Sequence, residues 1–148
     1  MKEFFLEELM ALLIYVDTDV FLNFMLERNN KWGEPLAPEA EELFTRAYYG
    51  EYEIIISEKT VEEFRGALTD PGQTPLLFTM LQAKDLLRIV TYTAQDLKEA
   101  EALDPENRND ALHALLAKKH GAQFVVTRNI RHFKKFSHII EPKLPKEI

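Results

Sequence analysis

Cysteine is absent from this chain of 148 residues, and its absence excludes several kinds of chemistry. Disulfide bonds, thiolate zinc sites and a cysteine nucleophile all need a thiol, and a chain without one suits a reducing compartment. Long apolar runs are missing too, because the longest one, residues 9–16, is too short to span a bilayer. Glu3, Glu7 and Glu8 stand where a secretory signal carries positive charge. We therefore expect a soluble, cytoplasmic protein without a membrane partner.

Repeats, linkers and low-complexity stretches are also lacking in the sequence. A hydrophobic content of 46% is enough for a chain of this length to build its own core. We therefore expect residues 1–148 to form a single domain.

The spacing of the apolar residues alternates along the chain between short continuous runs and a helical period. The short runs predict buried strands at residues 12–16, 54–56, 88–91 and 123–126, and a last edge strand at residues 138–140. Helical segments separate the strands, including residues 74–87 and residues 110–120 with Gly121 as the stop. Strands that alternate with helices imply an α/β fold with a parallel sheet covered on both faces.

Four polar motifs fall where a predicted strand gives way to a helix: I-Y-V-Asp17-T, S-E-K-T-V-E-Glu63-F, N-R-N-Asp110-A-L and V-V-T-R-Asn129. In open α/β sheets, sites form at the carboxyl ends of the strands. Three of the motifs bring a carboxylate to that edge, and clustered carboxylates repel one another unless a divalent cation neutralises them. The motifs therefore predict a cluster of carboxylates around a cation.

Each of these acids also has a purely structural explanation. Asp17 ends an apolar strand, where a carboxylate must be paired, capping or metal-bound, and Asp19 is expected to cap the following helix. Thr60-V-E-Glu63 is a capping box, but if Ser57 is the cap, Glu63 moves to the second turn and is available for chemistry. Asp110 could simply complement a helix dipole.

The charge of the chain is distributed unevenly. Residues 1–110 contain 10 Lys and Arg against 23 Asp and Glu, whereas residues 111–148 contain 8 against 2. A basic segment beside an acidic pocket suits a phosphodiester substrate, because phosphate contacts supply affinity that is independent of sequence. The candidate phosphate-binding residues are Arg128, Arg131, Lys134 and Lys135. The alternative is a solvated surface on which these residues pair with acids.

Histidines and aromatic residues are expected to be structural. His113, one turn after Asp110, and His132 are interpreted as packed or surface histidines. Tyr48, Tyr49 and Trp32 are candidates for stacking on bases, with packing in the core as the preferred explanation.

The four motifs together, in this order and spacing, resemble the PIN-domain nucleases, and in particular the VapC-like toxin subunits of prokaryotic toxin-antitoxin pairs. The resemblance extends from about Leu12 to Pro142. It implies a PIN-like three-layer α/β fold with a five-stranded, mainly parallel sheet, and Mg²⁺- or Mn²⁺-dependent cleavage of RNA. It also implies a homodimer and an antitoxin partner. Carried over by position, Asp17, Glu63 and Asp110 would be the catalytic, metal-binding carboxylates.

Two features depart from the family pattern. Many PIN domains have a further aspartate where this chain has Asn129, which offers a carbonyl oxygen but no charge and is therefore a weak ligand that puts a second metal ion in doubt. Family members commonly begin just before the first strand, and Met10-A-L-L-I-Y-V-D reads like such a start. Residues 1–9 are accordingly interpreted as an N-terminal extension.

Two rival functions remain open at this point. Asp17-Thr18-Asp19-Val20 matches the opening of haloacid-dehalogenase-like phosphatases, in which the first aspartate is the nucleophile and the second an acid/base. The other rival is a PIN-like binding or scaffold module that Asn129 makes catalytically weak.

Overall fold

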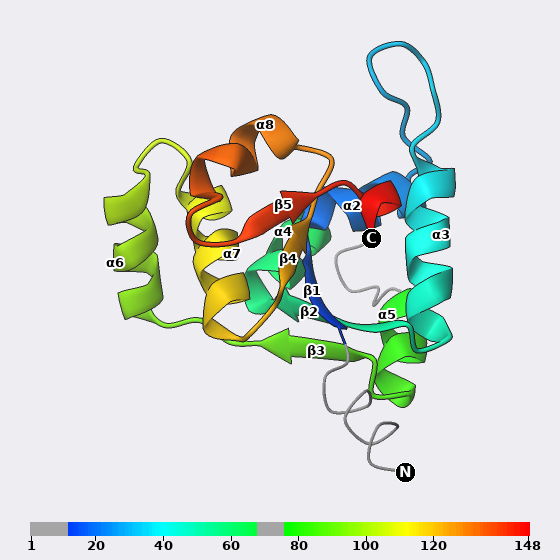
Figure 1. Ribbon diagram of the computed structural model, residues 1–148, viewed down its shortest axis with the longest axis horizontal. Coiled ribbons are helices and arrows are strands. Elements are labelled where there is room, and N and C mark those ends of the chain that lie inside the picture. Colours follow the sequence, from blue (N-terminus) through cyan, green and yellow to red (C-terminus); the bar gives the residue numbers. More distant parts are fainter. Residues whose placement is uncertain (1–11, 68–75) are drawn as a thin grey trace.

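Five short strands build one parallel sheet in the computed structural model, which describes residues 12–67 and 76–148. The strands are β1 (Leu12–Val16), β2 (Tyr52–Ser57), β3 (Leu87–Val90), β4 (Phe124–Val126) and β5 (Glu141–Lys143). Their order is β3-β2-β1-β4-β5 and every neighbouring pair is parallel. All the carboxyl ends of the strands therefore meet at one edge, and β1 lies at the centre (Figure 1).

Helices connect these parallel strands and cover the sheet on both faces (Figure 1). They are α2 (Thr18–Met25), α3 (Ala37–Tyr48), α4 (Glu58–Ala67), α5 (Leu76–Ala83), α6 (Ala94–Leu103), α7 (Arg108–Lys119) and α8 (Ile130–Phe133), with 3-10 turns η1 (Lys134–Phe136) and η2 (Pro145–Glu147). Parallel strands need such crossovers, since no tight turn can join them. The predicted three-layer α/β architecture is confirmed.

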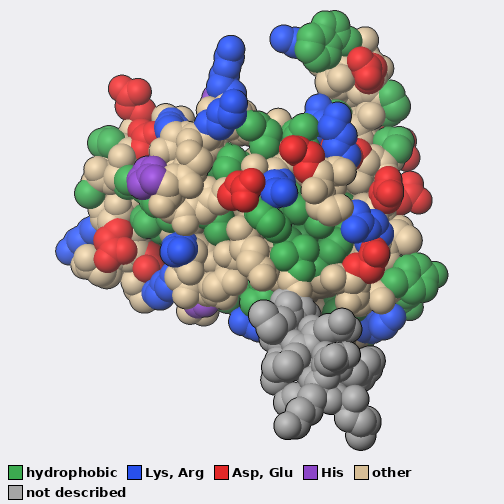
Figure 2. All heavy atoms as spheres, in the orientation of Figure 1, with side chains coloured by type: hydrophobic (Ala, Val, Ile, Leu, Met, Phe, Trp, Pro, Cys, Tyr) green, Lys and Arg blue, Asp and Glu red, His purple; other side chains and the backbone are tan. Residues whose placement is uncertain are grey.

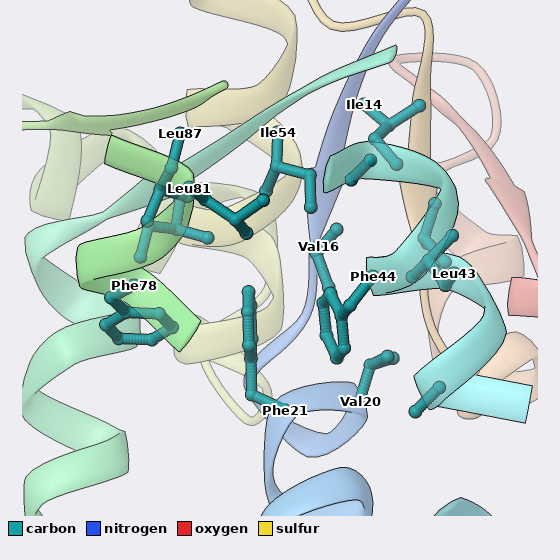
Figure 3. Packing of buried hydrophobic residues seen from close by; sticks show 14 of the residues in the cluster. Ile14, Val16, Val20, Phe21, Leu43, Phe44, Ile54, Phe78, Leu81 and Leu87 are labelled. Atoms are coloured by element: carbon teal, nitrogen blue, oxygen red, sulfur yellow. The ribbon is translucent and has the colours of Figure 1, made fainter. Parts of the chain in front are cut away.

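Alternation along the strands divides the hydrophobic core into two layers. Ile14 and Val16 of β1 point to one face and pack with α2, α3 and α5 (Figure 3), whereas Tyr15 points to the other face and packs with α6 and α7. Strand β2 repeats the pattern, with Ile54 and Ile56 on the first face and Ile55 on the second. Strands buried on both sides explain why the sequence shows continuous apolar runs instead of alternation.

Most predicted strands agree with the structure, and the last one is wrong. Residues 138–140 lie in a turn whose backbone amides bond back to Phe136, and Ile140 is buried in the second core layer. The edge strand is instead β5, the next three residues, which pair with β4. The apolar Ile139-Ile140 pair predicted a strand because a short buried turn has the same composition as a short strand.

Two further expectations concern the ends of the chain and its relation to membranes. The proposed N-terminal extension, residues 1–9, lies outside the described residues, so the single-domain assignment of residues 1–148 stays a prediction. Within residues 12–67 and 76–148, no helix has the length and apolar content needed to cross a bilayer.

Candidate functional site

Asp17 is the first polar residue after the central strand, and it lies almost fully buried at the carboxyl edge of the sheet, with 6% of its surface exposed. Its backbone amide extends the β1–β4 pairing, and its Oδ2 accepts a hydrogen bond of 2.9 Å from Thr127 Oγ1. It occupies the N-cap position of α2 but makes no capping hydrogen bond. Burial raises the pKa of the Asp17 carboxyl to about 6, although the charge of His113 opposes that shift. A carboxylate here is therefore costly without a nearby cation.

Glu63 approaches the same edge from the second turn of α4. The hydroxyl of Ser57 accepts a hydrogen bond from the backbone amide of Thr60, so Ser57 is the cap and Glu63 is not part of a capping box. The Glu63 Oε1 atom instead accepts hydrogen bonds from Thr18 Oγ1 at 2.8 Å and from His113 Nε2 at 2.6 Å. Burial of Glu63 favours the neutral acid, but the hydrogen bond and the charge of His113 outweigh it and lower the Glu63 pKa.

His113 is buried on the inner side of α7 and joins Glu63 to the core of the sheet. Its Nδ1 lies 2.6 Å from the Tyr15 hydroxyl, which donates its own proton to Ser57 Oγ at 2.8 Å. Because a carboxylate can only accept, Nε2 donates to Glu63. With the tyrosine proton directed to Ser57, Nδ1 is placed to donate to the tyrosine oxygen, an arrangement that favours the doubly protonated ring.

The electrostatics of His113 agree with this hydrogen-bond assignment. Burial disfavours the charged ring, but Tyr15 and then the hydrogen bond and charge of Glu63, together with the Asp17 charge, raise the His113 pKa well above its usual value. The expectation that His113 is a merely packed histidine is thus incomplete, since it is packed and also holds a candidate site residue. Its place one turn after Asp110 was the only sequence signal for that role.

Asp110 lies in the first turn of α7 and lines an open cleft of about 510 Å³ with Glu63 and His132. Residues 105–109 form the rest of the cleft wall. Asp110 Oδ2 is 3.6 Å from His132 Nδ1. Burial raises the Asp110 pKa, against the effects of His113 and His132. Glu63 and Asp110 therefore share one solvent-accessible depression.

Asn129 contacts residues on both the Asp17 side and the Asp110 side of the carboxyl edge of the sheet. Its backbone amide donates to Thr127 Oγ1 at 2.9 Å, and the same hydroxyl donates to Asp17. The Asn129 side-chain nitrogen lies 2.9 Å from His132 Nδ1, the atom that faces Asp110. Asn129 is the N-cap residue of the short helix α8 without making a capping hydrogen bond.

The predicted carboxylates are therefore neighbours, but they are not already gathered around a single point. In the part of the chain that the structure describes, no three acidic or histidine side chains form a ready metal-binding group. Thr127 occupies one oxygen of Asp17, and Thr18 and His113 occupy one oxygen of Glu63. The donors nevertheless suit a hard divalent cation, since they are carboxylate oxygens and one of them, Asp17, is an acid whose ionised form burial disfavours.

The basic residues divide into two sorts. Arg128 donates to Glu39 at 2.9 Å and Lys135 lies 2.7 Å from Asp104, so both are engaged with acids of the same chain. Arg131 and Lys134 are exposed, and the described residues supply neither of them with an ion pair. Two of the four predicted phosphate-binding residues, Arg128 and Lys135, are therefore paired with acids, as the alternative interpretation of the basic segment expected.

The prediction that Asp19 caps α2 is wrong. Asp19 lies inside the first turn of α2 and its Oδ1 is 3.5 Å from Arg28 Nη1. The helix begins two residues earlier than the apolar pattern indicated, because Thr18 is already helical and Asp17, not Asp19, takes the N-cap position.

The chain is an α/β protein with a parallel sheet and with acidic side chains at the carboxyl edge of that sheet. The PIN domain family model matches residues 14–131. The chain therefore belongs to the PIN domain family, and the resemblance noted in the sequence is confirmed. A search of curated proteins finds no match.

Twenty chains of known structure match this one. Among them is the crystal structure of VapBC2 from Rickettsia felis bound to a DNA fragment from their promoter. The TM-score is 0.58 with 18% sequence identity, and the alignment covers 90% of this chain and 98% of that chain. At this identity the likeness concerns the fold, which extends over nearly the whole of both chains.

Proposed function

We propose that this PIN-domain protein is a divalent-metal-dependent endoribonuclease that hydrolyses RNA phosphodiester bonds, with Asp17, Glu63 and Asp110 as its catalytic carboxylates. Membership of the family supports a nuclease. The observation that carries the proposal is the buried Asp17 carboxyl, whose pKa is raised to about 6 at the point where the central strand ends. This carboxylate makes no side-chain capping hydrogen bond to α2, and a cation would stabilise its ionised form.

Asp17, Glu63 and Asp110 would hold Mg²⁺ or Mn²⁺, with the amide oxygen of Asn129 as a weaker ligand. Such an ion, when bound, supplies Lewis acidity toward a phosphate oxygen and makes a coordinated water more acidic. Two or three carboxylates leave octahedral positions open for water and substrate. His113 would orient Glu63 through the hydrogen bond of 2.6 Å, and Thr127 would orient Asp17. The open cleft lined by Glu63 and Asp110 gives an extended anionic chain access to these two carboxylates.

The exposed basic residues of the C-terminal segment would contact the phosphates of the RNA. Arg131 and Lys134 are accessible for this role, whereas Arg128 and Lys135 would first have to leave Glu39 and Asp104. We therefore expect Arg131 and Lys134 to contribute most of the affinity for the RNA phosphates.

We further propose that the chain acts in the cytoplasm as the toxin of a toxin-antitoxin pair, as a homodimer with an antitoxin protein as partner. The structural likeness to VapBC2, an assembly whose solved structure includes promoter DNA, supports this role. The chain spans almost the full length of the similar chain, so the comparison does not depend on a shared fragment.

The two rival functions find less support in the structure. A phosphatase would need Asp19 beside Asp17 as acid/base, but Asp19, in the first turn of α2, turns toward Arg28 beyond the end of that helix. An inactive scaffold would not use the buried Asp17 carboxyl as a metal ligand. Both rivals can be distinguished from the nuclease by experiment.

The test is incubation of the purified protein with labelled RNA in Mg²⁺, in Mn²⁺ and in EDTA. We expect cleavage with either metal, none in EDTA and none with Asp17→Asn. Asp19→Asn is the matched control, because it removes a neighbouring charge that points away from the site; it should cleave like the wild type. Hydrolysis of a phosphate monoester that is lost in Asp19→Asn would identify a phosphatase instead, and the absence of both activities would identify a scaffold.

A further inference from the structure

The loop between α2 and α3 projects from the body of the molecule as an ordered arm, which we define as residues 28–36 (Figure 1). The two sides of the arm are joined by the bridge between Asn29 and Pro35 and by the hydrogen bond from the Leu36 amide to the Arg28 carbonyl at 2.9 Å. Gly33 turns the chain at the tip with a φ of 81°. The arm therefore has a defined conformation without packing against the core.

The tip of the arm presents Trp32, the only tryptophan of the protein, to solvent. Its exposed fraction is 72%, which is unusual for the residue type with the largest apolar surface. The backbone amides of Trp32 and Glu34 both donate to Asn30 Oδ1 at 2.9 Å, so the side chain of Asn30 fixes the turn that carries the indole. The Nζ atom of Lys31 lies 4.5 Å from the indole centroid. An aromatic ring held outward beside a cation is a platform that has no partner among the described residues.

The foot of the arm adjoins the candidate site. Asn30, Glu34, Pro35 and Leu36 line one cleft together with Arg128, the residue that follows Thr127 at the end of β4. Figure 1 shows the arm and α8 on the same side of the molecule, and Figure 2 shows basic side chains over α8 and, at the end of the arm, a basic side chain with an acidic one nearby. A strand of nucleic acid that reaches Asp17 and Asp110 could thus extend toward the arm.

We propose that Trp32 is a stacking platform for an unpaired base of the RNA, so that the substrate is single-stranded on the arm side of the site. This inference rests on the proposed ribonuclease function and adds a base-binding residue to it. A base inside a duplex has no free face, whereas an exposed base of any identity can stack on an indole.

The arm holds the base and not the phosphate backbone. Glu34, Glu39 and Glu42 line the cleft at its foot, and Arg128 there is already paired with Glu39. A cleft with this mixture of charges does not attract a polyanion. Trp32 should therefore contribute affinity that depends little on salt, in contrast to Arg131 and Lys134.

The experiment titrates single-stranded oligoribonucleotides into the Asp17→Asn protein in Mg²⁺, which under the proposed function binds RNA without cleaving it. Emission from Trp32 reports contact directly, because no other tryptophan contributes. We expect quenching by single-stranded RNA and little quenching by a duplex of the same sequence. Adding Trp32→Ala should weaken binding by roughly 5- to 150-fold, the equivalent of about 1–3 kcal/mol for one stacked base. The slope of log affinity against log salt should stay the same, and Trp32→Phe should restore most of the affinity.

Tyr49→Ala is the matched control, since Tyr49 is an equally exposed aromatic residue, with an exposed fraction of 76%, after the other end of α3. It should leave RNA binding unchanged. RNA that binds, by anisotropy of a labelled strand, without quenching Trp32 or without loss in Trp32→Ala would overturn the platform and leave the nuclease intact. Self-association that Trp32→Ala abolishes, with RNA affinity unchanged, would make the arm a protein interface and also overturn it. No binding of RNA at all would overturn both proposals.

Discussion

His113 and Glu63 lie face to face between α7 and α4, with 2.6 Å between Nε2 of the imidazole and Oε1 of the carboxylate. The opposite nitrogen of the ring is 2.6 Å from the Tyr15 hydroxyl. The imidazole thus contacts Tyr15 of the central strand on one side and Glu63, at the carboxyl edge of the sheet, on the other. Through this connection, a residue of the buried core sets the orientation of a candidate metal ligand.

Substitution of His113 should separate its structural role from its role toward Glu63. His113→Ala removes a charge-assisted hydrogen bond and should lower the free energy of unfolding by about 1.5–3 kcal/mol and weaken Mn²⁺ binding. Gln places its amide nitrogen near the position of Nε2, and Asn places its own near Nδ1. His113→Gln should therefore recover Mn²⁺ affinity, measured by calorimetry, whereas His113→Asn should not.

The control for this series is His138→Ala, which removes an exposed histidine of the same basic segment and should change neither quantity. Equal Mn²⁺ affinity in the Gln and Asn variants would show that the ring acts only by filling the core.

The pKa of Asp17 predicts how stability depends on pH in the absence of metal. Since the folded protein raises that pKa from 3.8 to about 6, the folded chain holds this proton more tightly than the unfolded chain. The contribution of the Asp17 carboxyl to the free energy of unfolding is then fully present below about pH 4, and it is lost as the pH rises through 6. At 1.36 kcal/mol per unit, the loss is at most about 3 kcal/mol.

Asp17→Asn removes this titration and should therefore be the more stable protein at neutral pH while having no ribonuclease activity. Denaturant unfolding in EDTA at several pH values checks the first statement. The difference in unfolding free energy between Asp17→Asn and the wild type should be small near pH 4, grow to pH 6 and then level off. A difference that does not vary with pH would mean that Asp17 is not the buried acid described above.

The fold was predictable because the buried strands leave a strong trace in the sequence. The runs Leu12–Val16 and Ile54–Ile56 are continuous and rich in β-branched and other apolar residues, which favours strands buried on both faces, and the helical periods between them favour parallel crossovers. Strand β5 was not predictable, since Glu141-Pro142-Lys143 carries no β pattern and becomes a strand only by pairing with β4. Its formation is a tertiary effect.

The positions of the candidate residues at the carboxyl edge of the sheet were predictable, but their contacts were not. Asp17, Glu63 and Asp110 could be found because each follows a recognisable strand or helix boundary. The link through His113, Tyr15 and Ser57 could not, because it joins residues 42 and 98 positions apart in sequence. Similarly, nothing in the basic tract revealed that Arg128 would meet Glu39 on α3, 89 positions away.

The basic residues should contribute unequally to RNA binding. Arg131→Ala and Lys134→Ala should each reduce the slope of log affinity against log salt by about 0.7, the value for one phosphate contact on a single strand. Arg128→Ala and Lys135→Ala should change the slope less, since Glu39 and Asp104 already neutralise these side chains. Salt titrations of binding on all four variants test this order. Equal slopes in the four variants would mean that the ion pairs open when RNA binds.

Asn129 offers a test of where the metal site lies. Its backbone amide bonds to Thr127, which holds Asp17, and its side chain meets His132, which faces Asp110. Asn129→Asp would therefore place a further carboxylate between the two predicted ligands. Without metal, this like charge should lower the melting temperature, because burial already disfavours the ionised form of Asp17.

With Mn²⁺ present, the same carboxylate should have the opposite effect, because an added anionic ligand tightens binding of a divalent ion. An ion that binds only the folded chain stabilises it by mass action, so the gain in melting temperature on adding Mn²⁺ should be larger in Asn129→Asp than in the wild type. Asn30→Asp makes the same change of charge in the arm, outside the site, and should show the gain of the wild type. If Asn129→Asp also shows only that gain, Asn129 lies outside the metal site, and Asp17, Glu63 and Asp110 remain as its proposed ligands.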